Sequence, residues 1–406
     1  MSQLSPFRAL RPAPETAAHV AAEPYDVLST EEARAIAAEN PLSFLRVTRS
    51  EIDLPPGTHP YDGRVYQQAS RNFEELKRAA PMTLELAPAL YFYRLRTDWH
   101  EQIGLAGCFS LEEYGHGFIK KHERTRKDKE DDRTRHITEL RAQTGIAFLT
   151  YRSLPAVNAV AQRVSTTAPL YDFVAPDGVS HTIWRVAGAD LSTLVDAFRS
   201  LPALYIADGH HRVASAARAR EMLMGAGAGK ASVDEFVAVA FPDSQVCILP
   251  YNRIVKDLGS ETSESFLVAL ESTGIAVHPG PSMPERRGEV AMYLAGEWYT
   301  LTLPPPDPGA LRVHTLDVDL LQRRVLEPLL KIGDIRTDKR IDFVGGIRGP
   351  VALERLVDEG SAAVAFSMFP VTVADLMAIA DTGEVMPPKS TWFEPKLRDG
   401  LLVNLI

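Results

Sequence analysis

The sequence predicts an α+β protein of two or three domains. Of its 406 residues, 45% are hydrophobic, 24% are charged and 8% are aromatic, which is the usage of a globular protein rather than of a disordered or coiled-coil chain. Apolar runs typical of strands occur among amphipathic segments typical of helices, and no repeat with the period of a solenoid or propeller is visible. The two cysteines, Cys108 and Cys247, allow at most one disulfide, so a large apolar core must hold the fold together.

Local patterns predict individual elements in chain order. Residues 30–39 begin with a capping residue and an acidic first turn, and residues 66–79 are amphipathic, so both segments predict helices. Apolar runs predict strands at 89–94, 104–110, 203–207, 235–241 and 362–366. Proline, glycine and charge shifts predict loops at 53–63, 278–288 and 304–309.

The most apolar long stretch, residues 361–380, is interrupted by Pro370 and Asp375. It therefore predicts a buried strand followed by a helix rather than a membrane span. The formal net charge of −9 does not favour binding to nucleic acid or to an anionic membrane, because both need a basic face. Residues 1–8 show no charged-then-apolar signal pattern, and we expect a cytoplasmic protein.

The sharpest local signal is Asp208-Gly209-His210-His211-Arg212, where an apolar run gives way to a helical pattern. Glycine allows close backbone approach, a helix N-terminus presents unpaired N–H groups, and His211 and Arg212 add donors, so the turn suits an anion. Asp208 would hold Mg²⁺ or a substrate ammonium group beside that anion. The same pattern is also typical of a polar helix cap with solvated histidines.

Residues 119–141 are densely charged with both signs interleaved. We interpret this segment as a solvated helix or mobile loop, with an active-site lid over a polyanionic ligand as the alternative. Near its start, Glu123 is the candidate general base, because neighbouring cations such as Lys121 and Arg124 would keep its carboxylate ionised. An exposed glutamate without a catalytic role is the alternative.

A third candidate lies near the C-terminus, where two prolines precede Lys389, Ser390 and Thr391. The prolines stiffen the loop, and one cation with two hydroxyls suits a phosphate or a carboxylate. A plain loop anchored by Trp392 and Phe393 is the alternative. The Pro-Tyr-Asp-Val motif at 24–27 fits either a polar site element or a strand-edge turn.

Several familiar motifs are absent from the sequence. It has no P-loop, no dinucleotide-binding glycine fingerprint, no His-Glu-x-x-His zinc helix and no Gly-x-Ser-x-Gly nucleophile elbow. The histidines are scattered apart from the pair His210 and His211, and such a pair without a third spaced ligand is weak evidence for a transition-metal site.

Taken in order, His122-Glu123, the Asp-Gly-His-His-Arg turn and the Lys-Ser-Thr tail resemble the free L-serine kinases of the ParB/sulfiredoxin superfamily. The whole chain also looks like the bacterial and archaeal family known as domain of unknown function 1015. The resemblance implies an N-terminal α/β extension at 1–100, a ParB/sulfiredoxin-like core with a charged lid at 101–260, and a C-terminal α/β domain at 261–406. That last domain would contribute the Pro-Lys-Ser-Thr loop.

The resemblance also implies a reaction, in which ATP or ADP with Mg²⁺ phosphorylates free L-serine to O-phosphoserine. Glu123 would take the hydroxyl proton and Asp208 would orient the substrate or the metal ion. The residues that would hold phosphates are Gly209, His210, His211, Arg212, Lys389, Ser390 and Thr391. The alternative is a non-catalytic nucleotide-binding switch of the ParB type. Sulfiredoxin chemistry is excluded, because the turn carries no cysteine.

Overall fold

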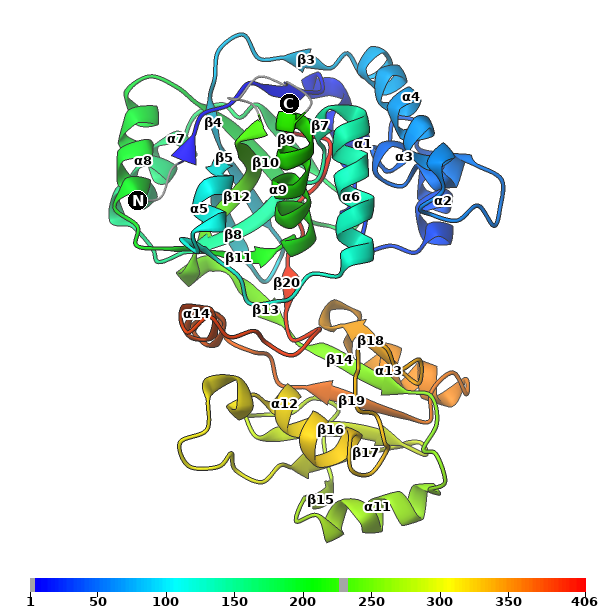
Figure 1. The fold of residues 1–406 in the computed structure, drawn as a ribbon. Helices are drawn as coiled ribbons and strands as arrows, with labels where there is room; N and C mark the ends of the chain where they lie inside the picture. The colour runs from blue at the N-terminus through cyan, green and yellow to red at the C-terminus, as the bar shows by residue number, and fades with distance from the viewer. Residues whose placement is uncertain (1–3, 226–232) are drawn as a thin grey trace. The chain divides into compact units, whose positions relative to one another are not determined.

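The computed structural model describes residues 4–225 and 233–406, which divide between two compact units (Figure 1). The first unit comprises Met1–Val246 and Pro395–Ile406, and the second comprises Cys247–Glu394. These boundaries differ from the expected divisions near residues 100 and 260. The reason is that the strands on either side of residue 100 are hydrogen-bonded neighbours within one sheet of the first unit.

The first unit is built on a nine-stranded mixed sheet. Its strands follow the order β6-β11-β8-β12-β5-β4-β10-β9, and β1 pairs with β5. The pairs β6–β11 and β8–β12 are parallel and the other neighbours are antiparallel. The strands are β1 (Leu4–Ser5), β4 (Leu90–Arg96), β5 (Glu101–Ser110), β6 (Ile119–Lys120), β8 (Ala147–Tyr151), β9 (Tyr171–Val174), β10 (Ser180–Val186), β11 (Leu204–Asp208) and β12 (Glu235–Pro242).

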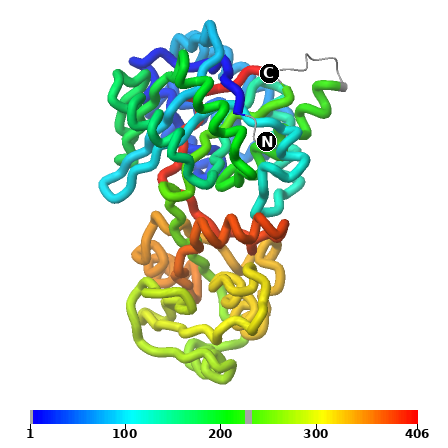
Figure 2. The backbone as a smooth tube through the Cα atoms, turned by 90° about the vertical axis from the view of Figure 1, so that its left-hand side faces the viewer, coloured from blue at the N-terminus to red at the C-terminus, as the bar shows by residue number. Residues whose placement is uncertain are grey.

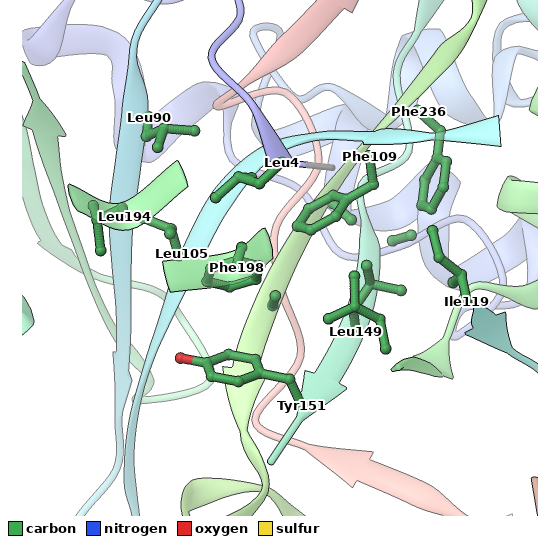
Figure 3. Packing of buried hydrophobic residues seen from close by; sticks show 14 of the residues in the cluster. Leu4, Leu90, Leu105, Phe109, Ile119, Leu149, Tyr151, Leu194, Phe198 and Phe236 are labelled. Atoms are coloured by element: carbon green, nitrogen blue, oxygen red, sulfur yellow. The ribbon is translucent and has the colours of Figure 1, made fainter. Parts of the chain in front are cut away.

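Helices pack against this sheet and bury its apolar side chains. Figure 3 shows Phe109 of β5, Leu149 of β8, Phe236 of β12 and Phe198 of the helix α8 in one cluster. The helices of this unit are α1 (Ala17–Val20), α2 (Thr30–Glu39), α3 (Leu45–Thr48), α4 (Gly63–Ala79), α5 (Leu111–Gly115), α6 (Lys127–Leu140), α7 (Pro155–Val164), α8 (Ala189–Arg199) and α9 (His210–Gly225), with short turns η1 (Pro14–Thr16), η2 (Ser50–Asp53) and η3 (Asp243–Gln245).

The C-terminal segment is an integral part of the first unit. A second sheet, ordered β3-β2-β21-β7, places β21 (Val403–Leu405) between β2 (Ala9–Arg11) and β7 (Ala142–Gln143), with β3 (Thr83–Leu84) at its edge. Figure 2 shows this last segment of the chain, in red, beside the blue N-terminal segment. Strands from opposite ends of the sequence are therefore neighbours in one sheet, and Ala9 stands opposite Asn404 in their register.

The second unit has its own antiparallel sheet, ordered β15-β17-β16-β19-β14-β18, and a two-stranded ribbon of β13 and β20. The side chains of Ile254, Tyr293, Val344 and Leu353 form an apolar cluster there. The elements are β13 (Cys247–Leu249), β14 (Tyr251–Val255), α11 (Ser263–Ser272), β15 (Ala276–Pro279), β16 (Glu289–Leu294), β17 (Glu297–Thr302), η4 (Arg312–Thr315), α12 (Asp317–Leu321), η5 (Gln322–Leu326), β18 (Ile341–Gly345), η6 (Gly346–Arg348), α13 (Gly349–Asp358), β19 (Val364–Met368), α14 (Val373–Asp381) and β20 (Trp392–Glu394).

The structure confirms most of the elements predicted from local patterns. Helix α2 has the predicted bounds and a capping box between Ser29 and Glu32, and α4 begins at Gly63, three residues before the predicted start. The predicted strands correspond to β4, β5, β11, β12 and β19, and residues 361–380 contain a buried strand followed by α14, as predicted. Within residues 4–225 and 233–406, no helix combines the length and apolar character that a bilayer crossing needs.

The charged segment at 119–141 is mostly the helix α6, which has a buried face. Asp132, His136, Ile137 and Leu140 are among its buried residues. On the neighbouring helix α9, Arg218 pairs with Glu130 of α6 at 3.4 Å. The segment is therefore a helix packed into the first unit rather than a mobile loop.

Candidate functional site

The turn between β11 and α9 has the strand, turn and helix that its sequence predicts. β11 ends at Asp208 and α9 begins at His210, and Gly209 between them has a φ of 91°. The N–H of Gly209 donates to Asp208 Oδ1 at 2.9 Å. A Cβ atom on Gly209 would lie 3.3 Å from the Cα of Ala147 and 3.2 Å from Nη1 of Arg212. Both the backbone conformation and the close approach therefore favour glycine.

His122, Glu123 and His210 converge at the start of α9. Because β6 and β11 are parallel neighbours, the residues that follow β6 lie near the carboxyl end of β11. The rings of His122 and His210 are 4.4 Å apart between their centres, at an angle of 86°. One ligand atom from each of the three residues lies within 4.8 Å of the other two. The fold thus adds His122 and Glu123 to a histidine that stands far from them in the sequence.

Hydrogen bonds and burial indicate that both histidines are neutral. Nδ1 of His122 lies 2.8 Å from the carbonyl oxygen of Ile206, and because a carbonyl can only accept, this nitrogen carries the hydrogen. The backbone N–H of His122 donates to Nε2 of His210 at 3.4 Å. Burial lowers the pKa of His122 to about 4 and lowers the pKa of His210 well below its usual range. Each ring therefore keeps one nitrogen with a lone pair near pH 7.

Asp208 is held as an anion by two cations. Burial would raise the pKa of its carboxyl group, but Lys396 and Arg212 hold that pKa well below its usual range. Nζ of Lys396 donates to Asp208 Oδ2 at 3.2 Å, while Oδ1 accepts from Gly209. A lysine ammonium group thus already balances the charge that the expected Mg²⁺ would balance, and the assignment of Mg²⁺ to Asp208 stays a prediction.

Arg212 is buried beneath the turn and is bound to the protein itself. Its Nη2 donates to Asp26 Oδ1 at 2.8 Å and its Nη1 donates to the carbonyl oxygen of Ile146 at 3.2 Å. Burial would lower the pKa of the guanidinium group, but Asp26 and Asp208 raise that pKa, so the group is a permanent cation. The guanidinium carbon lies 5.7 Å from the centre of the Tyr25 ring. The Pro-Tyr-Asp-Val motif therefore supplies partners for Arg212.

A small cavity of about 30 Å³ lies beside Arg212, and Tyr25, Arg133 and Asp399 are among the other residues that line it. The N–H of Ile146 donates to Asp399 Oδ1 at 3.3 Å, whereas Asp399 Oδ2 and Arg212 Nε are buried without a hydrogen-bond partner among the described residues. Burial raises the pKa of Asp399 to about 7, although Arg212 and the N–H of Ile146 oppose that rise. A cavity of this size accommodates water and is far too small for a nucleotide.

His211 connects α9 to the beginning of the charged segment. The backbone N–H of Arg126 donates to Nε2 of His211 at 3.0 Å. His211 is not part of the cluster formed by His122, Glu123 and His210. The two adjacent histidines of the turn therefore have different surroundings, which sequence alone does not show.

Lys389, Ser390 and Thr391 belong to the second unit, between α14 and β20. Lys389 has a φ of 56°, which is uncommon for a residue with a side chain, and its Nζ lies 5.0 Å from the centre of the Tyr251 ring. Ser390 is buried, and its Oγ donates to the carbonyl oxygen of Pro387 at 2.6 Å. The loop thus has a defined conformation. Its contribution to the same site as the β11–α9 turn stays a prediction.

The structure therefore brings Glu123, Asp208 and His210 to the carboxyl end of β11. Sequence reasoning missed several of their neighbours. The only available signal for Lys396 was its place in the proline-containing run that also holds Lys389. The missed residues are His122 as a cluster member, Lys396, Asp26 and Asp399.

A family model described as Protein of unknown function (DUF1015) matches residues 4–319. The chain belongs to this family. The match extends over both units, and it includes His122, Glu123 and the β11–α9 turn but not Lys389, Ser390 or Thr391. No curated protein matches the chain.

Three solved structures have a weak likeness to this member of the family. A conserved hypothetical protein from Pyrococcus furiosus is 16% identical, with a TM-score of 0.37, and the match covers 74% of this chain and 95% of that one. Free serine kinase in complex with AMP is 14% identical, with a TM-score of 0.37 and coverage of 72% and 91%. SbnI with C-terminal truncation from Staphylococcus aureus is 10% identical, with a TM-score of 0.39 and coverage of 74% and 87%. Because these values are low, the function proposed below rests on the residues of this chain.

Proposed function

We propose that the protein is a small-molecule kinase that transfers a phosphoryl group from ATP or ADP to the hydroxyl of free L-serine. The observation that supports this most is the convergence of Glu123 with the start of α9, where a ligand atom of Glu123 lies within 4.8 Å of one on His210. A carboxylate that can accept a proton is thus next to a helix N-terminus that can bind phosphate. The motif order resembles that of the free serine kinases.

Phosphate binding is assigned mainly to the first turn of α9. The N–H groups at the start of a helix lack partners within the helix, and the helix dipole favours a negative charge there. The backbone N–H groups of His210 and His211 are the proposed donors, whereas the N–H of Gly209 already donates to Asp208 Oδ1. Arg212 was expected to contact phosphate directly, but its two amino groups bond to Asp26 and Ile146, so we now propose that it positions the turn. Lys389, Ser390 and Thr391 stay proposed phosphate ligands.

Recognition of serine is assigned to the pair formed by Asp208 and Lys396. Free serine is a zwitterion, with an ammonium group and a carboxylate on one carbon. The ionised Asp208 would accept hydrogen bonds from the substrate ammonium, and Lys396 would donate to the substrate carboxylate. The pair thus has the charges that distinguish a free amino acid from a serine within a peptide, which lacks both charged groups.

The chemical step balances with the groups of this chain and the two substrates. Glu123 accepts the proton of the serine hydroxyl, and the oxygen forms a bond to the terminal phosphorus of the nucleotide. The bond from that phosphorus to its bridging oxygen breaks, and the shortened nucleotide leaves with the electron pair. No step is assigned to an ion at Asp208, because Lys396 already balances the charge of that carboxylate.

The test is to incubate the purified protein with L-serine, Mg²⁺ and either ATP or ADP, and to analyse the products by mass spectrometry. We expect O-phosphoserine together with the shortened nucleotide. A peptide with serine between blocked termini is the matched control substrate and should stay unmodified. Tight nucleotide binding without phosphorylation of any amino acid or small hydroxyl compound would contradict the proposal and support a non-catalytic nucleotide-binding switch.

A further inference from the structure

We propose that His122, Glu123 and His210 form a binding site for a divalent transition-metal ion, with Zn²⁺ the favoured ion and one coordination position left open. The three side chains are the cluster of potential metal ligands that the described part of the chain contains. Binding of the ion does not depend on phosphoryl transfer. The proposal therefore extends beyond the kinase function and can be tested separately from it.

The distances allow the three residues to share one ion. Bonds of about 2.1 Å from a tetrahedral Zn²⁺ place its ligand atoms about 3.4 Å from one another. The three ligand atoms here all lie within 4.8 Å of one another, so shifts of about 1 Å bring them together. The ion would replace the N–H of His122 as the partner of His210 Nε2, a contact that is long at 3.4 Å. Glu123 is partly exposed, whereas both histidines are buried.

One histidine already has the outer hydrogen bond that metal-binding histidines commonly make. Nδ1–H of His122 donates to the carbonyl oxygen of Ile206 at 2.8 Å, which orients the ring and leaves Nε2 as the ligand atom. Ile206 lies in the buried centre of β11, so this partner is rigid.

The set of ligand atoms favours one class of ion. Imidazole nitrogen suits Zn²⁺ and Co²⁺, whereas Mg²⁺ prefers oxygen ligands and keeps several water molecules. Two imidazoles and one carboxylate leave a fourth position for water or a phosphate oxygen. The site should therefore select Zn²⁺ or Co²⁺ against an excess of Mg²⁺.

Occupation of this site would affect the reaction proposed above. A carboxylate that binds a metal ion is a poor acceptor for the serine proton, so the bound ion would inhibit phosphoryl transfer. This consequence rests on the proposed function, whereas the binding of the ion does not.

The test is a titration of the full chain, stripped of metal, with Co²⁺ in the presence of millimolar Mg²⁺, followed by visible absorption. We expect absorption bands of a tetrahedral Co²⁺ site that saturate at one equivalent and disappear when Zn²⁺ is added. His210→Ala and Glu123→Gln should each weaken Co²⁺ binding by more than tenfold, because each removes a ligand. His211→Ala is the matched control and should bind Co²⁺ as the unmodified chain does, since His211 lies outside the cluster.

Two outcomes would overturn the metal site: no Co²⁺ bands in the unmodified chain at one equivalent, or equal Co²⁺ affinities for the unmodified chain and Glu123→Gln. Glu123 is partly exposed, so this variant tests the site even where a change of the buried His210 disturbs folding. Production of O-phosphoserine by a chain that binds no Co²⁺ would overturn the metal site alone. A chain that binds Co²⁺, but makes no phosphorylated product when it is freed of Co²⁺ and supplied with Mg²⁺, would overturn the kinase proposal alone.

Discussion

Single residues around the β11–α9 turn owe their charge states to different causes. Burial keeps His122 and His210 neutral, and the two neighbouring cations keep Asp208 anionic. Asp399 is buried with one oxygen unpartnered and has a pKa near neutrality, so its charge changes within the physiological range. These differences arise from the surroundings of each group, since Asp208 and Asp399 have the same side chain.

We predict that Glu123→Gln lowers the rate of serine phosphorylation by about 10²- to 10⁴-fold, the usual cost of losing a general base. The amide keeps the shape of the side chain but cannot accept the proton. Nucleotide affinity should change little, because phosphate binding is assigned to α9. Steady-state kinetics and calorimetric titration with nucleotide measure the two effects. An unchanged turnover number would remove Glu123 from the mechanism.

We predict that Asp399→Asn removes a pH dependence of stability. The raised pKa means that Asp399 retains a proton in the folded chain at pH values where the unfolded chain has lost it. That stabilisation is present below the unfolded pKa of about 4 and is lost as the pH rises through 7. Between pH 5 and pH 8 the unfolding free energy of the unmodified chain should therefore fall by about 2 to 3 kcal/mol relative to Asp399→Asn. Denaturant unfolding at the two pH values measures this difference. If the unfolding free energy changed equally with pH in both proteins, that would be inconsistent with a buried protonated Asp399.

At the scale of elements, the site depends on the abrupt change from β11 to α9. β6 and β11 are parallel neighbours, which places Glu123 beside the first residue of the helix. Gly209 allows the chain to reverse within one residue while it passes close to β8 at Ala147. The end of β11 and the start of α9 are thus joined by a single residue, Gly209, whose backbone conformation favours glycine.

We predict that Gly209→Ala destabilises the protein more than Gly178→Ala. Gly209 has a φ of 91° and Gly178 has a φ of 83°. Alanine is disfavoured in this conformation, so each substitution should lower the unfolding free energy by about 1 to 2 kcal/mol. A Cβ on Gly178 meets nothing within 4 Å, whereas one on Gly209 meets Arg212 and Ala147 at 3.2 to 3.3 Å. Thermal unfolding of the two variants compares them directly. An equal loss of thermal stability in both variants would show that the close contacts of a Cβ at Gly209 do not affect stability.

At the scale of the whole molecule, the first unit is discontinuous in sequence. Its last segment carries β21, Lys396 and Asp399, and Val403 within it is fully buried in an apolar cluster. The second unit has a separate sheet and apolar cluster within Cys247–Glu394. Each unit therefore has its own sheet and apolar cluster. Those of the first unit are complete only when residues 395–406 pack back onto it.

We predict that a chain ending at Glu394 loses the fold of the first unit and keeps that of the second. Removal of β21 leaves the edges of β2 and β7 unpaired and exposes the apolar cluster that Val403 fills. Limited proteolysis with mass spectrometry should then yield a resistant fragment close to residues 247–394 and rapid cleavage elsewhere. The full-length chain is the control. Equal resistance of both chains in residues 4–225 would contradict this dependence on the C-terminal segment.

The sequence by itself was enough for a fold that mixes helices and strands, most strands, the helices α2 and α4, and the strand, turn and helix around Gly209. Alternation, amphipathic period, caps and turn residues are local, so they can be interpreted over a few neighbouring positions. Only the tertiary structure decided that His210 meets His122 and Glu123, that Lys396 pairs with Asp208, and that Asp26 binds Arg212. Those contacts join residues that are far apart in the chain. They depend on strand order and on the return of the C-terminal segment, which no local pattern encodes.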